Sequence, residues 1–216
     1  MEGTDLAALR KALAGLFPAG VAVAAVEIGT EQAAPLPEEE AALCGAVPAR
    51  RAEFAAGRTA ARQALAALGL PAVAIPAGRD RAPVWPQGIS GSISHGAGYA
   101  VAAVHGGRPL GVDLEAEGAV EPDLWPVVCC VDELAALPDT DRRQAVARVF
   151  SAKEAVFKAQ YPLTGAMIGF DAVEVRLQAD GFIARFRQTV GPFAAGHEMA
   201  GRSAGLCGVI VSGVVA

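Results

Sequence analysis

Two acidic residues interrupt the apolar stretch GVDLE at residues 111–115. If this stretch is a β-strand, Asp113 and Glu115 project from the same face, because side chains two positions apart lie on one side of a strand. Two such carboxylates are a good start for a magnesium site, since Mg²⁺ takes one or two protein carboxylates and completes its shell with water and phosphate oxygens. A solvated strand face would explain the same pair, so the stretch indicates a metal site only together with a further ligand.

A second charged stretch, FSAKEAVFK at residues 150–158, has helical spacing. In a helix, Glu154 and Lys158 share one face, whereas Lys153 points to one side. The stretch also has a plain structural interpretation, in which Ser151 and Glu154 form a capping box at a helix start and Glu154 forms a surface ion pair with Lys158. Periodicity alone favours this structural interpretation.

The residues before these stretches predict helices and one strand. Residues 4–16 repeat leucine at helical spacing after a possible N-cap at Thr4, and residues 20–28 are typical of a buried strand. The acidic residues 38–40 suit the first turn of a helix, where carboxylates meet the positive end of the helix dipole. An alanine-rich helix is expected over residues 48–68.

The remainder of the chain predicts two antiparallel sheets. After an ordered loop over residues 71–88, three short strands suggest a meander, and helical signals return between residues 132 and 160. The expected strands are residues 89–94, 99–104 and 110–115 in the first sheet and residues 172–177, 182–186 and 206–211 in the second. The simplest organisation is an α+β fold of two halves joined near residues 111–118.

The composition limits the class of protein. The chain has 216 residues, of which 53% are hydrophobic and 19% charged, enough for a sizeable core in one large or two small domains. No apolar run approaches the roughly 18 residues of a membrane span, and Glu2 and Asp5 stand where a secretory signal carries basic residues. We therefore expect a cytoplasmic protein without a membrane span. The net charge of −5 argues against nucleic acid as a partner.

The cysteines predict neither a zinc site nor a disulfide framework. The chain holds Cys44, Cys129, Cys130 and Cys207. These positions contain no CxxC pair and no recognisable zinc spacing, so we expect reduced thiols.

Taken together, the two charged stretches closely resemble the signature of the 4′-phosphopantetheinyl transferase superfamily, G-V-D-x-E followed by F-S-x-K-E-A-x-x-K. The stretches GSISH at residues 91–95 and PVWP at residues 83–86 resemble further parts of that family. The stretch RRAEFAAGR at residues 50–58 is similar to the arginine helix of its Sfp-type, enterobactin-synthetase-component-D-like branch. The resemblance covers roughly residues 48–175.

The resemblance implies a fold and a reaction. The family fold has two similar α+β halves with antiparallel sheets, related by a pseudo-twofold, with coenzyme A in the cleft between them. For this chain it implies an N-terminal half over residues 1–111, with the nucleotide-binding arginines and the SISH loop, and a C-terminal half over residues 112–216, with the magnesium and catalytic motif. The implied reaction moves the phosphopantetheine arm of coenzyme A onto a serine of an apo acyl or peptidyl carrier protein and releases adenosine 3′,5′-bisphosphate.

The same resemblance implies roles for the acidic and lysine residues. Asp113 and Glu154 would ligate Mg²⁺, and Glu115 would do so directly or through water. Glu154 would also act as general base for the serine proton, since a carboxylate beside the metal can reach the incoming hydroxyl. Lys153 and Lys158 would hold the diphosphate oxygens as compact point charges.

Coenzyme A binding is implied for a second group of residues. The expected contacts are Arg50, Arg58, Arg81, Ser94 and His95, together with both lysines. Arginine suits the 3′-phosphate and adenine end because its planar fork can pair with a phosphate through two hydrogen bonds. The choice between Arg79 and Arg81 stays open, because the loop has no fixed register.

Three other functions compete with this interpretation. A serine hydrolase would need G-x-S-x-G, and residues 88–92 read GISGS, which fails at the last position. A different magnesium phosphotransferase or phosphohydrolase would be active without a carrier protein, and a coenzyme A or carrier-binding module would lack transfer. The carrier and its pathway stay open, although the arginine helix favours siderophore, polyketide or nonribosomal peptide biosynthesis by analogy. We expect a monomer, because two halves already supply a cleft.

Overall fold

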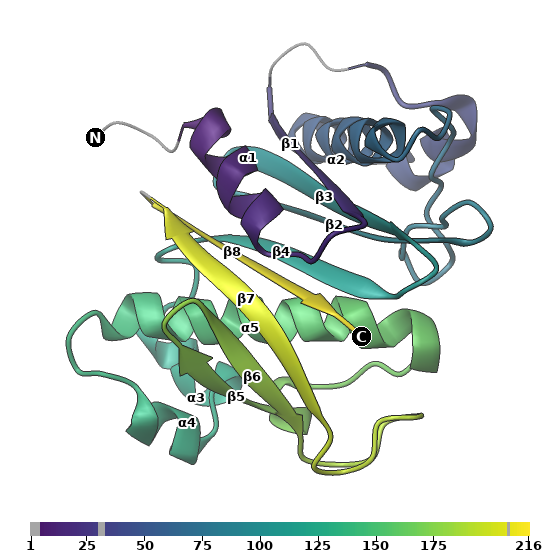
Figure 1. Cartoon of the computed structure of the whole chain (residues 1–216). Coiled ribbons are helices and arrows are strands. Elements are labelled where there is room, and N and C mark those ends of the chain that lie inside the picture. Colours follow the sequence, from purple (N-terminus) through teal and green to yellow (C-terminus); the bar gives the residue numbers. More distant parts are fainter. Residues whose placement is uncertain (1–4, 30–32, 207) are drawn as a thin grey trace.

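The computed structural model describes residues 5–29, 33–206 and 208–216, which form two α+β halves stacked on each other (Figure 1). The first half holds α1 (Leu6–Gly15), β1 (Val21–Glu27), the 3₁₀ helix η1 (Pro37–Leu43), α2 (Pro48–Ala67), β2 (Ile89–Gly96) and β3 (Tyr99–Gly106). The second holds β4 (Leu110–Ala116), η2 (Pro122–Leu124), α3 (Trp125–Val128), α4 (Val131–Ala136), α5 (Arg142–Thr164), η3 (Phe170–Ala172), β5 (Val173–Gln178), β6 (Gly181–Phe186), β7 (Glu198–Leu206) and β8 (Val209–Val215). The two-half α+β fold is therefore confirmed.

In the N-terminal half, α2 covers a three-stranded antiparallel sheet in the order β1-β3-β2. Small side chains dominate both surfaces, with Ala60 and Ala64 of α2 packed in one core with Ala100 and Ala102 of β3. Helix and sheet therefore approach closely, and a Cβ on Gly57 would already lie 3.0 Å from the side chain of Ile93. This close contact fixes α2 above β2.

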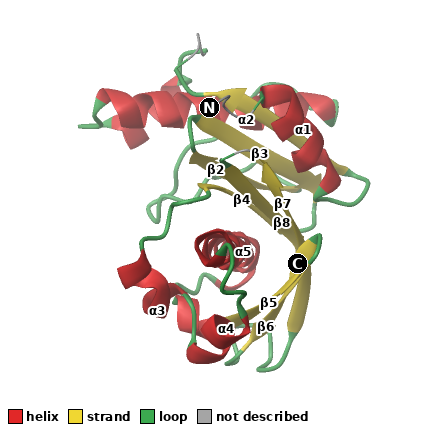
Figure 2. Cartoon of the chain, turned by 90° about the vertical axis from the view of Figure 1, so that its left-hand side faces the viewer, coloured by secondary structure: helices red, strands yellow, loops and turns green. Residues whose placement is uncertain are grey.

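In the C-terminal half, α5 lies against a five-stranded antiparallel sheet in the order β4-β8-β7-β6-β5. Figure 2 shows α5 nearly end-on, with the sheet on one side and α3 and α4 on the other. Val146 and Val156 of α5 are fully buried and share a core with Phe182 and Phe186 of β6. Because α5 is covered on more than one side, residues on several of its faces are buried.

A further core joins the two halves. Leu9 and Leu13 of α1 are fully buried in one cluster with Val101 of β3, Leu114 of β4 and Val211 of β8. In Figure 1, α1 lies over the region where the two sheets meet. The first helix thus packs on strands of both halves.

Two strand predictions were wrong. Residues 110–115 were expected to continue the meander with β3, but β4 pairs antiparallel with β8 instead. Leu110 to Leu114 are all buried, which suits a strand between two layers rather than an open meander. Residues 206–211 were expected to form one strand, but Gly208 has φ +84° and turns the chain between β7 and β8. Cys207 lies outside the described residues.

The helix predictions need smaller corrections. The N-cap of α1 is Asp5, whose Oδ1 accepts the Ala7 N–H at 3.1 Å, and Thr4 lies outside the described residues. Residues 38–40 lie in the first turn of a helix as predicted, and this helix is the 3₁₀ helix η1. Ser151 lies inside the long helix α5, so the capping-box interpretation of Ser151 and Glu154 is wrong.

Three further observations bear on the sequence analysis. Among the described residues, no helix combines the length and the apolar character that a membrane crossing requires. The thiols of Cys44, Cys129 and Cys130 are free. The predicted boundary between residues 111 and 112 falls inside β4, and the division of the chain there stays a prediction.

Candidate active site

The strand β4 and the helix α5 touch through their backbones where the two charged motifs meet. A Cβ on Gly111 would lie 1.8 Å from the carbonyl oxygen of Ala155, so only glycine fits at this crossing. Asp113 follows two residues after Gly111 on the strand, and Glu154 and Lys158 flank Ala155 on the helix. The glycine of the GVDLE motif therefore brings the acidic strand against the acidic and basic helix.

A partly buried network holds Asp113, Lys158 and Ser94 together. The Lys158 ammonium donates to Oδ1 of Asp113 at 2.6 Å and to the Ser94 hydroxyl at 3.0 Å. The Ser94 hydroxyl in turn donates to the same Asp113 oxygen at 2.9 Å. Lys158 is therefore paired with a strand of its own half and with β2 of the other half, and not with Glu154 as the surface ion-pair interpretation required.

The same strand β2 links the two halves by a side-chain hydrogen bond and by a close approach of its backbone to β4. The N–H of Val112 donates to the Ser92 hydroxyl at 3.0 Å, and a Cβ on Gly96 would lie 2.6 Å from the carbonyl oxygen of Leu114. The small residues Ser92 and Gly96 thus let β2 lie directly against β4. This junction places Ser94 beside Asp113.

Burial and like charges disfavour ionisation of the two remaining carboxylates. Burial, the charge of Asp113 and that of Glu154 raise the pKa of Glu115 to about 7, against the opposing effect of Lys158. Burial raises the pKa of Glu154 as well, with Lys158 lowering it and Asp113 raising it. Burial is the larger cause of both shifts, and a cation placed between these groups would offset both the burial and the repulsion.

The donors fit a hard cation, although they are not gathered around one point. Among the described residues, no three His, Cys, Asp or Glu side chains form a ready metal cluster. The second carboxylate oxygen of Asp113, Oδ2, is nevertheless buried without a hydrogen-bond partner. A buried carboxylate oxygen with no donor is costly, and a cation would satisfy it. Rotation of the Glu115 and Glu154 side chains would be needed to complete the ligand set.

Lys153 lies elsewhere, contrary to the sequence prediction. Its ammonium is buried in the C-terminal half and donates to Glu133 at 2.8 Å and to the carbonyl oxygens of Val128 and Phe170, both at 2.9 Å. All three of its protons are therefore used inside the protein. This placement contradicts the expectation that Lys153 holds the diphosphate.

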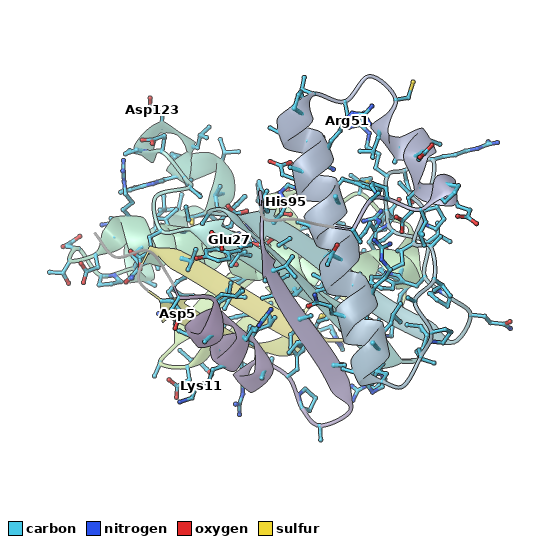
Figure 3. All side chains as sticks on the ribbon, turned by 90° about the horizontal axis from the view of Figure 1, so that it is seen from above. Asp5, Lys11, Glu27, Arg51, His95 and Asp123 are labelled. Carbon is cyan, nitrogen blue, oxygen red and sulfur yellow. The ribbon has the colours of Figure 1, made fainter. Side chains whose placement is uncertain are left out.

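Three side chains form a polar cluster at the edge of α2 and β2. Nη1 of Arg50 donates to Nε2 of His95 at 2.7 Å and to Glu53 at 3.2 Å. Because a guanidinium is always a donor, Nε2 accepts and the neutral ring carries its proton on Nδ1, 3.8 Å from Glu53. Burial lowers the pKa of His95, with Glu53 opposing and Arg50 reinforcing the shift. Figure 3 shows His95 beside α2.

Arg58, which also lies on α2, is mostly buried. Its Nε donates to the carbonyl oxygen of Ile75 at 2.6 Å, and its guanidinium lies 4.1 Å from the centre of the Phe54 ring. Burial lowers the pKa of Arg58 to about 10, against the opposing charge of Glu39. Within the described part of the chain, its two terminal nitrogens have no hydrogen-bond partner. A role in coenzyme A binding stays a prediction for Arg50, Arg58 and His95.

A cavity of about 610 Å³ opens beside Lys158 between the two halves. Its wall combines the loop before β2, with Arg81 and Trp85, and the helix α5, with Phe157 and Tyr161. The Tyr161 hydroxyl donates to Asp80 across the two halves at 2.8 Å. The described lining includes Arg81 and not Arg79, which favours Arg81 as the residue that faces a bound ligand.

Several of these site residues were not identified from the sequence. Glu53 stands three positions after Arg50 inside the arginine-helix motif, and the i, i+3 spacing of opposite charges could have indicated its contact. Asp80 and Tyr161 had no such signal, because their hydrogen bond joins a loop to a helix 81 residues away. Glu133 was missed for the same reason.

The fold and the site define a two-half α+β enzyme with a carboxylate and lysine cleft next to an apolar cavity. Comparison with known proteins gives its family. The family described as 4′-phosphopantetheinyl transferase N-terminal domain matches residues 38–105, and the 4′-phosphopantetheinyl transferase superfamily matches residues 109–204. The chain therefore belongs to the 4′-phosphopantetheinyl transferases.

Two similar proteins carry the same name, and a third is a component of enterobactin synthase. The chain is 39% identical to 4′-phosphopantetheinyl transferase Svp of Streptomyces mobaraensis over 76% of this chain and 70% of that protein. It is 36% identical to 4′-phosphopantetheinyl transferase Npt of Nocardia iowensis over 76% of each chain. Enterobactin synthase component D of Salmonella typhi is 38% identical over 58% of this chain and 54% of that protein.

Proposed function

We propose that the chain transfers the 4′-phosphopantetheine arm of coenzyme A to a serine hydroxyl of an apo carrier protein, with Mg²⁺ as cofactor. The observation that carries this proposal is the buried Asp113, whose Oδ1 is paired with Lys158 and whose Oδ2 is unpaired, while Lys158 itself lines the cavity between the two halves. The family membership and the names of the relatives support the same reaction.

Three carboxylates would hold the cation. Asp113 offers its unpaired oxygen, and Glu115 and Glu154 offer carboxylates whose pKa values are raised chiefly by burial, so that Lys158 alone does not offset the cost of their charge. Mg²⁺ bound there would neutralise charge that builds on the diphosphate oxygens during transfer. Deprotonation of Glu115 and Glu154 would accompany its binding.

Lys158 is suited to hold the diphosphate. Its ammonium lies at the boundary between the carboxylates and the cavity and is 24% exposed, so a ligand can reach it. The N–H that Lys158 now donates to Asp113 would be free to donate to a phosphate oxygen once a cation binds that carboxylate. Lys158 therefore acts as a compact charge next to the bond that breaks.

Glu154 is the general base in this proposal. Its pKa is raised by burial, which brings it closer to neutral pH and makes it a better proton acceptor for an alcohol. It lies on the same helix as Lys158 and also lines a smaller cavity with Phe170 and Met167. A serine hydroxyl entering from that side would meet the carboxylate before the diphosphate.

The cavity and the arginine cluster divide coenzyme A between them. The apolar wall with Trp85 and Phe157 fits the pantetheine arm, because most pockets for flexible ligands are apolar with few polar groups. Arg50, Arg58 and His95 would take the 3′-phosphate and the adenine end, and Arg81 the phosphates at the cavity rim. We propose siderophore, polyketide or nonribosomal peptide carriers as the substrates, and the similarity to enterobactin synthase component D supports this choice. Cytoplasmic location and a monomeric state complete the proposal.

The deciding experiment is intact-protein mass spectrometry of purified apo-carriers incubated with coenzyme A, Mg²⁺ and the enzyme. We expect a mass gain of one phosphopantetheine group on the carrier serine and none with a serine-to-alanine carrier. Addition of EDTA should abolish the gain. Breakdown of coenzyme A without any labelled carrier, across siderophore, polyketide and fatty-acid carriers, would contradict the proposal and favour a phosphohydrolase.

A further inference from the structure

A buried glutamate anchors the long helix of each half in the same way. In the C-terminal half, Glu133 accepts the N–H of Cys130 at 2.7 Å on Oε2 and the N–H of Val175 at 2.7 Å on Oε1, and it pairs with Lys153 of α5 at 2.8 Å. Both side chains of this pair are almost fully buried. The carboxylate thus ties together the start of α4, the strand β5 and the helix α5.

The N-terminal half repeats this arrangement. Glu39 accepts the N–H of Leu36 at 2.9 Å on Oε2 and the N–H of Ile75 at 2.8 Å on Oε1, and it pairs with Arg62 of α2 at 2.8 Å. In both halves the glutamate is the third residue of a short helix and accepts a hydrogen bond from a backbone N–H at the start of that helix. It also pairs with a cationic side chain of the long helix and accepts a backbone N–H from a residue that comes after the long helix in the chain. We call the two arrangements the Glu133 clamp and the Glu39 clamp.

The Glu133 clamp determines which way α5 faces. Successive helical residues are about 100° apart, so fixing Lys153 against Glu133, Val128 and Phe170 turns the neighbouring Glu154 away from this core. Lys158, five positions after Lys153, then lies within about 40° of Glu154. The clamp therefore presents both proposed catalytic side chains to the cleft although it touches neither.

The Glu39 clamp holds a different part of the site. Ile75 gives its N–H to Glu39, and its carbonyl oxygen accepts Nε of Arg58 at 2.6 Å. Arg58 lies one turn before Arg62 on the same face of α2. The clamp therefore fixes the guanidinium proposed to bind the nucleotide end of coenzyme A.

We infer that the two clamps are positioning devices with separate tasks: Glu133 and Lys153 align the reacting groups on α5, and Glu39 and Arg62 align the coenzyme A contact Arg58. This inference rests on the proposed function for the roles of Glu154, Lys158 and Arg58. A clamp that served stability alone would change kcat and coenzyme A affinity together or leave both unchanged. Separate tasks predict that each clamp changes one constant.

The test compares two matched double variants, Glu133→Gln with Lys153→Met and Glu39→Gln with Arg62→Met. Removing both charges of a pair avoids leaving one buried charge uncompensated. For the Glu133 clamp we expect kcat to fall about tenfold to a hundredfold, the effect of a misplacement of roughly 1 Å, while the coenzyme A affinity in calorimetry stays near wild type. For the Glu39 clamp we expect about tenfold weaker coenzyme A binding, the effect of losing one charge-assisted contact, with kcat near wild type.

Urea unfolding and one surface variant complete the design. Arg176→Met removes an exposed pair with Glu198 in the C-terminal sheet and should change neither constant. If either double variant fails to fold, Lys153→Arg and Arg62→Lys, which keep the charge, should show the same division with smaller changes. Parallel losses of kcat and coenzyme A affinity, or no loss in either, would overturn the inference. Absence of transfer by wild-type enzyme, or full activity of Glu154→Gln, would instead overturn the proposed function.

Discussion

Removing Lys158 should destabilise the protein because it leaves Asp113 buried without a counter-charge. The Asp113 side chain is 2% exposed and receives hydrogen bonds on Oδ1 only from Lys158 and Ser94. Breaking a buried ion pair by removing one partner costs about 3 to 5 kcal/mol. Since the Lys158 side chain is 24% exposed, water already screens the pair, and we expect about 3 kcal/mol for Lys158→Met.

Urea unfolding followed by circular dichroism in metal-free buffer measures this loss. The double variant Asp113→Asn with Lys158→Met should regain most of it, because the buried charge is gone as well. Gln144→Met on the same helix, which removes a hydrogen bond to Glu117, is a matched control expected to cost about 1 kcal/mol. A single variant as stable as wild type, or a double variant no better than the single, would refute the reasoning.

The same variant separates two effects of Lys158. Without coenzyme A, Lys158→Met should bind Mg²⁺ more tightly than wild type in calorimetry, because the ammonium no longer competes for Asp113. Turnover should nevertheless fall, because the diphosphate loses its cation. Weaker Mg²⁺ binding by the variant would show that Asp113 is not a metal ligand.

Three other predictions concern single side chains. Glu154→Gln should abolish transfer while leaving the metal-free protein at least as stable to urea as wild type, because burial disfavours the charged carboxylate, and near-normal turnover would contradict its role as base. The pKa of Glu115 is raised to about 7 from 4.5, so the folded protein holds this proton more tightly than the unfolded chain does. In metal-free protein, ionisation of Glu115 therefore lowers the free energy of unfolding progressively from about pH 4.5 to about pH 7, and the loss persists at higher pH. Glu115→Gln should thus be more stable than wild type at about pH 8 and similar at about pH 4, and equal gains at both would exclude this cause. Gly111→Ala should lose at least about 1 to 3 kcal/mol of unfolding free energy, since its Cβ would lie 1.8 Å from the Ala155 carbonyl oxygen, and a neutral effect would mean that β4 and α5 can separate.

Local sequence patterns predicted where helices and strands occur better than they predicted which strands pair with each other. The helix α2 was predicted within one residue because its alanine-rich periodicity and Gly69 mark its course and end. The pairing of β4 with β8 was missed because nothing in residues 110–116 identifies a partner about a hundred residues away. Strand identity is local, whereas sheet order depends on which faces other elements cover.

The site shows the same limit at the scale of one side chain. The motifs correctly indicated that the strand with Asp113 and the helix with Lys158 would meet, and the structure brings these two side chains within 2.6 Å. Lys153 was misplaced because α5 is buried on several faces, so its periodicity does not show which face meets the cleft. Lys153 precedes Glu154 by only one position on the helix, and its side chain lies in the core.

The first helix has a practical consequence for anyone dividing the chain. Leu9 and Leu13 fill a core made by strands from both halves, so a cut near residue 111 would give two fragments that each display an apolar sheet surface. We expect such fragments to rebuild this shared core only when they associate with each other. The chain is in this respect a natural starting point for a complementation reporter, in which signal depends on the reunion of two inactive pieces.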